Sequence, residues 1–157
     1  MTLRARAGIR LKMKMIYASE AEIVHVGEGL MACSLQREEW THGAHFAAAL
    51  WLMRYRPDLE PAAAMPGLIR AFNDAVGTVN SDGSGYHETI TLASLRAARG
   101  VFDSFPADMP VYRIVNALLG TNFANPNWLL EYWSWDRLMS VEARRGWLEP
   151  DLKALPF

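Results

Sequence analysis

The chain has a single cysteine, Cys33, among its 157 residues. One cysteine cannot form an intrachain disulfide, and it cannot supply the paired thiolates of a cysteine-based zinc knuckle. We therefore expect a protein that folds without disulfides in a reducing compartment, and the cytoplasm fits best. A chain of this length buries roughly two thirds of its unfolded surface, which is enough for one domain with its own core.

The chain also lacks a long hydrophobic run. Its most apolar segment, residues 44–53, is much shorter than the roughly 20 residues that a membrane-spanning helix requires. The sequence also contains no apolar stretch long enough for a secretory signal near its start. We therefore expect no membrane association and interpret residues 44–53 as part of a buried helix.

Neither sign of charge dominates, because the formal net charge is −1. A chain with this balance has no broad positive electrostatic field that would attract nucleic acid, so we expect no nucleic-acid partner. Five basic residues and no acidic ones stand among the first fourteen. We interpret residues 1–18 as a flexible basic leader and 19–157 as a single helical domain. A tag remnant or an over-extended start explains the leader equally well.

Known catalytic and nucleotide-binding signatures are missing. The stretch Gly83-Ser84-Gly85 follows no predicted strand and has neither dinucleotide-binding nor Walker spacing. No serine stands in a nucleophile elbow, and the metalloprotease motif His-Glu-x-x-His is absent. Serine and cysteine nucleophile chemistry therefore has no support in the sequence.

Helix signals are present along the whole chain after the leader. Ser19 and Glu22 have the spacing of a capping box, and Ser34 is a candidate cap for the second helix. Gly27 and Gly29 weaken the first helix, and residues 24–26 allow a short strand instead. The predicted helices run over 20–33, 35–55, 60–76, 85–102 and 110–120, followed by an aromatic helix over 128–135 and a short helix over 140–146.

These elements predict an all-α fold. The natural arrangement is an antiparallel helical bundle of four longer helices, with short carboxyl-terminal helices packed over one end. Apolar residues surround nearly the whole circumference of the helix predicted over 35–55, which is typical of a helix packed on several sides.

Histidines lie on two stripes that face the interior of this bundle. At ~100° per residue, a helix that begins near residue 35 places Glu38, His42 and His45 on one stripe. A helix that begins near residue 85 places His87 and Thr91 on another. Two facing stripes of this kind can present His42, His45 and His87 to one point, as helical bundles do at metal sites.

Three imidazoles in this arrangement predict one divalent transition metal, zinc or iron, with an open position for water or a small-molecule substrate. A carboxylate beside it would manage the proton of the bound water, and Glu38 or Glu39 is the candidate. Zinc favours hydrolysis and iron favours oxidative chemistry. Residues expected to support the ligands or contact substrate are Thr41, Tyr86, Glu88, Thr91 and Arg144.

The histidines also have a simpler interpretation, because an inward histidine is often a hydrogen-bonded core residue. On that hypothesis the protein is a non-catalytic helical module that binds a small ligand or a partner protein. A third hypothesis is an oligomeric structural protein, with a homodimer formed through exposed tryptophans. His25 is expected to be a surface or packing residue, and Arg144 to tie the carboxyl-terminal segment to the bundle.

Two motifs, Trp40-Thr41-His42-Gly43-Ala44-His45 and Tyr86-His87-Glu88-Thr89, resemble an uncharacterised family of small bacterial proteins. The resemblance covers residues 20–156 and includes the ending Ser140–Arg144. It implies a shared histidine site and no substrate. The DinB-like group of three-histidine bundles is similar in architecture, but its His-x-x-x-His pair is replaced here by His-x-x-His, so that likeness concerns fold type alone.

Overall fold

The computed structural model of the protein describes residues 15–157, and within that range it is helical and contains no strand. The predicted all-α class is confirmed. Residues 1–14 of the predicted leader lie outside the described residues. The α-helices are α1 (Glu20–Met31), α2 (His42–Tyr55), α3 (Pro61–Ala75), α4 (Glu88–Asp103), α5 (Val111–Leu119), α6 (Trp135–Leu138) and α7 (Val141–Arg145), and the 3₁₀ helices are η1 (Arg37–Glu39), η2 (Asn122–Ala124) and η3 (Trp128–Glu131).

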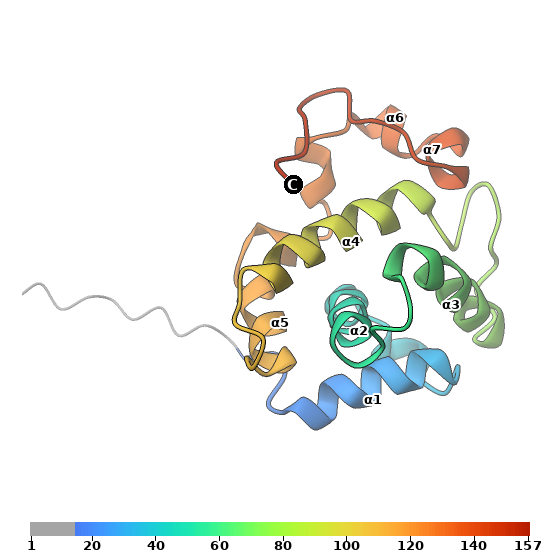
Figure 1. Ribbon diagram of the computed structural model, residues 1–157. Helices are drawn as coiled ribbons and strands as arrows, with labels where there is room; N and C mark the ends of the chain where they lie inside the picture. The colour runs from blue at the N-terminus through green and yellow to red at the C-terminus, as the bar shows by residue number, and fades with distance from the viewer. Residues whose placement is uncertain (1–14) are drawn as a thin grey trace, which may run out of the picture.

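Helix α2 stands at the centre of the fold. Figure 1 shows it nearly end-on, with α1, α3, α4 and α5 around it and the short α6 and α7 beyond α4. Residues 46–52 of α2 are all buried, which the apolar circumference of this helix predicts. No helix within residues 15–157 is both long and apolar enough to cross a membrane.

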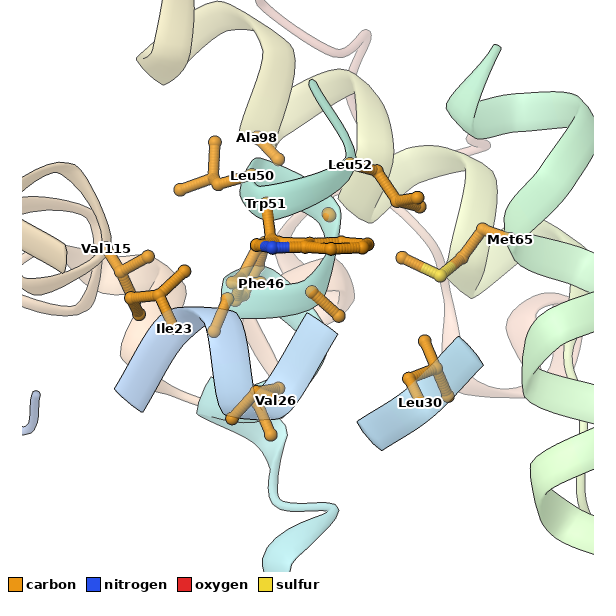
Figure 2. Packing of buried hydrophobic residues seen from close by; sticks show 14 of the residues in the cluster. Ile23, Val26, Leu30, Phe46, Leu50, Trp51, Leu52, Met65, Ala98 and Val115 are labelled. Carbon is orange, nitrogen blue, oxygen red and sulfur yellow. The ribbon is translucent and has the colours of Figure 1, made fainter. Parts of the chain in front are cut away.

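The packing of α1 on α2 depends on a glycine. A Cβ atom at Gly27 would lie 2.0 Å from Cδ2 of Trp51, so only a residue without a side chain fits beneath the indole. Figure 2 shows the ring of Trp51 with Ile23, Val26 and Leu30 on the side of α1. The glycine that weakens α1 as an isolated helix therefore permits its tertiary contact.

Both ends of α1 follow local rules. Glu22 Oε2 accepts a hydrogen bond from the Ser19 amide at 3.1 Å, which confirms the predicted capping box. At the other end, Cys33 adopts a left-handed conformation with φ of 53°. The amides of Cys33 and Ser34 donate to the carbonyls of Leu30 and Gly29, which is a Schellman motif.

The leader that the sequence predicts over residues 1–18 is attached to the fold near its end. The backbone amides of Ile16 and Tyr17 donate to Asn116 Oδ1 at 3.1 and 3.0 Å, and Asn116 Nδ2 donates to the Tyr17 carbonyl at 2.7 Å. Asn116 belongs to α5 and is buried. One side-chain amide therefore holds the chain against α5 just before α1 begins.

Two predicted helix starts are wrong. Helix α2 begins at His42 and not at residue 35, because Thr41 Oγ1 accepts from the Ala44 amide at 3.2 Å and caps the helix there. Helix α4 begins at Glu88 and not at residue 85, because His87 Nδ1 accepts from the Ile90 amide at 3.2 Å. Ser84, in the loop before α4, donates to the Val79 carbonyl and does not cap the helix.

The aromatic helix predicted over 128–135 is also wrong. The chain forms the short helix η3, leaves it at Tyr132, and begins α6 at Trp135, where Ser134 Oγ accepts from the Arg137 amide. Asp151 accepts hydrogen bonds from the amide and hydroxyl of Ser134, which turns the chain at this point. The predicted short helix near 140–146 is confirmed as α7, capped by Ser140.

Replacement of Gly27 by alanine should lower the free energy of unfolding by about 2 kcal/mol, because overlap with the Trp51 ring costs more than the helix propensity of alanine returns. Gly67 in α3 is the matched control, since a Cβ there meets no atom within 4 Å. Gly67→Ala should raise stability by up to ~1 kcal/mol. Urea unfolding measures both, and a stabilised Gly27→Ala protein would contradict the close contact.

Candidate functional site

A pocket of about 300 Å³ opens between α2, α3, α4 and η3, and we call it the apolar pocket. The side chains that carry polar atoms are those of His42, His45, Thr91, Ser94 and Trp128, and none of the lining residues is acidic. The apolar walls include Phe46, Met65, Ile69, Ile90, Trp128 and Leu129. A mostly apolar cavity with a few convergent polar groups is the usual form of a small-molecule site.

A second pocket of about 370 Å³ adjoins the first, and we call it the polar pocket. The two share His45, Ile69, Ile90 and Thr91, so His45 lies at the wall between them. The polar pocket adds side chains from η1, α3 and the loop before α4. Those that carry polar groups are Arg37, Trp40, Asn73, Thr78, Tyr86 and His87.

His45 is held in one tautomer. Its Nδ1 lies 2.7 Å from the Thr41 carbonyl, which can only accept, so Nδ1 carries the proton and Nε2 is left as an acceptor. The ring packs against the indole of Trp40 with centroids 4.0 Å apart. Burial lowers the pKa of His45 from 6.5 to about 4, against the opposing effect of the hydrogen bond to Thr41.

At neutral pH His45 therefore presents an uncharged acceptor to the pockets. No hydrogen bond reaches its Nε2 from any residue between 15 and 157, although the ring lines both cavities. Nε2 is not closed off by neighbouring atoms, so this acceptor is open to a ligand that brings a donor.

His42 also lines the apolar pocket, from the first turn of α2. Its Nε2 donates to the Phe123 carbonyl at 2.7 Å, and its ring meets Phe46 edge-on. This bond attaches η2 to the amino-terminal end of α2. The remaining nitrogen of His42, Nδ1, is the acceptor of the neutral ring.

His87 has a structural contact at each ring nitrogen. Nδ1 accepts from the Ile90 amide at 3.2 Å, and Nε2 donates to the Leu138 carbonyl at 2.7 Å. Burial lowers its pKa as well. His87 lines the polar pocket, whereas His42 lines the apolar one. Within the described part of the chain, no group of three or more histidine, cysteine or acidic side chains is placed to hold a metal ion.

The predicted carboxylates lie away from both pockets. Glu38 is exposed on η1, and Glu39 accepts hydrogen bonds from His25 at 2.8 Å and from the Gln36 amide at 2.6 Å. Because α2 begins at His42, the helical stripe predicted to join Glu38 to the histidines does not form. The exposed His25 is a surface residue, as predicted.

The other predicted residues are placed around the start of α4. Tyr86 donates its hydroxyl proton to Glu88 Oε2 at 2.6 Å, and burial together with this neighbour raises the pKa of Tyr86. Arg144 donates to the carbonyls of Gly85 and Tyr86 at 3.0 and 3.3 Å, so it ties α7 to the loop as predicted. Thr91 alone among these residues lines both pockets.

Two polar residues of the apolar pocket and four of the polar pocket are absent from the predicted set. Those of the polar pocket are Arg37, Trp40, Asn73 and Thr78. The indole Nε1 of Trp128 is buried with no hydrogen-bond partner in residues 15–157, and the residue lines the apolar pocket. Ser94 lines the same pocket from α4. The stripe of His87 and Thr91 includes Ser94 and gives a partial signal for it, but no local pattern distinguishes Trp128 from the other tryptophans of the chain.

Comparison with known proteins assigns no family: no family model matches the chain, and neither a curated protein nor a solved structure matches it.

The pH dependence of stability should report His45, whose side chain is half-buried. Between pH 6.5 and about 4 the unfolded chain protonates this ring and the folded chain does not, so stability falls as the pH falls through that window. We expect the loss to exceed that of a His45→Phe variant by on the order of 2 kcal/mol. Urea unfolding at pH 7 and pH 4.5 measures this difference, and equal losses in the two proteins would contradict the lowered pKa of His45.

Proposed function

We propose that the protein is a non-catalytic helical module that binds a small, neutral, mostly apolar molecule in the apolar pocket. The ligand carries one hydrogen-bond donor, an O–H or N–H group, that meets His45 Nε2. The observation that carries this proposal is the unpaired Nε2 acceptor on a ring whose tautomer is set by the Thr41 carbonyl, at the wall of a mostly apolar cavity.

The size and lining of the pocket support a compact, neutral ligand. A volume of about 300 Å³ stands at the lower end of the range for small-molecule sites. Its lining residues include no lysine, arginine, aspartate or glutamate, and His45 is uncharged at neutral pH. A charged group buried there would lose its hydration without gaining an ionic partner, which disfavours ions.

The surroundings of the pocket support binding over catalysis. General acid and base chemistry needs a titratable pair within hydrogen-bond reach of the reacting atoms. Glu39 already accepts bonds from His25 and Gln36, outside the pocket. Both ring nitrogens of His87 are used in the fold. His45 thus acts as a recognition group, and the other titratable side chain of the lining, His42, donates its Nε2 proton to the Phe123 carbonyl.

Phenol and toluene test the proposal, because they have nearly the same shape and differ in one donor. Both should bind the wild type, as followed by amide chemical shifts in an NMR titration. In His45→Phe the affinity of phenol relative to toluene should fall about tenfold, the cost of one unpaired polar group. His25→Phe is the matched control and should leave the ratio unchanged, since His25 lies on the surface.

A second variant fills the cavity. The hydroxyl of Ser94 makes no hydrogen bond within residues 15–157, and its half-buried side chain lines the apolar pocket. Ser94→Leu should therefore weaken phenol and toluene together while α4 stays folded, as judged by circular dichroism. Unchanged affinities in Ser94→Leu, or an unchanged ratio in His45→Phe, would place the probes outside the pocket and refute the proposal.

Metal binding by His42, His45 and His87 is the alternative, with zinc or iron as the ion. Its support is that His42 and His45 line one pocket and each keeps an acceptor nitrogen. The site would require His87 to release either the Ile90 amide or the Leu138 carbonyl. Metal-activated water acting on a small molecule would then be the chemistry to expect.

Elemental analysis of the untagged protein tests the alternative. If the three histidines share a metal, near-stoichiometric zinc or iron should accompany the wild type and disappear from His42→Ala and His87→Ala proteins of unchanged helicity. A wild type that stays metal-free after incubation with zinc and with ferrous iron would end the metal hypothesis. If the same metal-free sample binds phenol, ligand binding does not depend on a metal.

A further inference from the structure

We propose that the polar pocket is a second ligand site, which takes a small planar aromatic carboxylate bearing an N–H or O–H donor. The proposal goes beyond the function argued above, since it concerns the cavity on the other side of His45 and an anionic ligand. Three features of the pocket carry it: an arginine without an acidic partner in residues 15–157, a buried amide with an unused acceptor, and aromatic rings in the same lining.

Arg37 is the charged residue of this pocket. Its Nη2 donates to Thr78 Oγ1 at 2.9 Å, which anchors the guanidinium on the loop before α4. No aspartate or glutamate in residues 15–157 lies within ion-pair distance of Arg37, and no acidic residue lines the pocket. Arg37 is an exposed residue, and the N–H groups of its guanidinium that do not bind Thr78 form a fork that matches a carboxylate.

Asn73 supplies the acceptor. The residue is 7% exposed and lines the polar pocket from α3. Asn80 Oδ1 accepts from the Tyr86 amide at 3.0 Å and from Asn73 Nδ2 at 2.9 Å, so the orientation of both amides is determined by the backbone donor. Asn73 Oδ1 makes no hydrogen bond to another described residue and remains for a ligand donor.

Aromatic side chains form the apolar part of the pocket. The ring centroid of Trp40 lies 5.5 Å from that of Phe72 and 4.0 Å from that of His45, and all three residues line the polar pocket. Flat ring surfaces favour a planar ligand, and the anion then extends toward Arg37. The charge at Arg37 distinguishes this cavity from the apolar pocket, whose lining residues include no lysine, arginine, aspartate or glutamate.

Indole-3-carboxylate and indole-3-carboxamide are the probes, because they share the ring and the N–H donor and differ in charge. Wild type should bind the carboxylate about fivefold more tightly than the carboxamide at low salt, and added NaCl should reduce that preference. Arg37→Gln should remove the preference and leave the carboxamide affinity unchanged. Arg113→Gln, an exposed arginine on α5, is the matched control and should keep the preference.

The outcomes separate this proposal from the first one. Equal affinity of wild type for the two probes, or a preference that survives in Arg37→Gln, would overturn the second site. Carboxylate binding that is lost in Ser94→Leu and kept in Arg37→Gln would place the probe in the apolar pocket; this result overturns the second site and leaves the proposed function standing. If the wild type does not bind phenol but shows a carboxylate preference that Arg37→Gln removes, the proposed function is refuted and the second site stands.

Discussion

The contact between Gly27 and Trp51 determines how closely helices α1 and α2 approach each other. Because α1 presents no side chain at this point, the indole of Trp51 lies against the α1 backbone, and Ile23, Val26 and Leu30 close around it. Close packing on this side is what lets α2 stand inside the fold with neighbours on its other sides. The rest of the architecture is arranged around that buried helix.

The pockets arise on the side of α2 that faces α3 and α4. Ala49 and Ser94 are small residues that line the apolar pocket from two helices, so the helices meet without filling the space between them. The start of α2 then places two histidines at the rim. One of them, His45, is bonded to the carbonyl of the residue that caps its own helix, which ties its tautomer to the helix boundary.

Helix positions followed from the sequence where local chemistry decides them. The capping box at Ser19 and Glu22, the serine cap of α7 and the apolar circumference of α2 involve residues near one another in the chain, and all three are observed. The start of α2 was predicted seven residues too early, because Ser34 and Thr41 are equally good caps and the choice depends on packing. Leu35 is buried against Gly29 outside any helix, and that contact is not local.

The sequence by itself determined the all-α class and most residues of the longer helices, because these depend on periodicity and capping within a few residues. The predicted histidine stripes depended on helix starts that the structure does not have, since His87 caps α4 from outside and Glu38 lies on η1. Only the tertiary structure decided which ring nitrogens are used. Both ring nitrogens of His87 form hydrogen bonds, one with the Ile90 amide and one with the Leu138 carbonyl. One ring nitrogen of His42 donates to the Phe123 carbonyl. Those carbonyls come from segments 51 and 81 residues away, and no local pattern encodes a hydrogen bond over that separation.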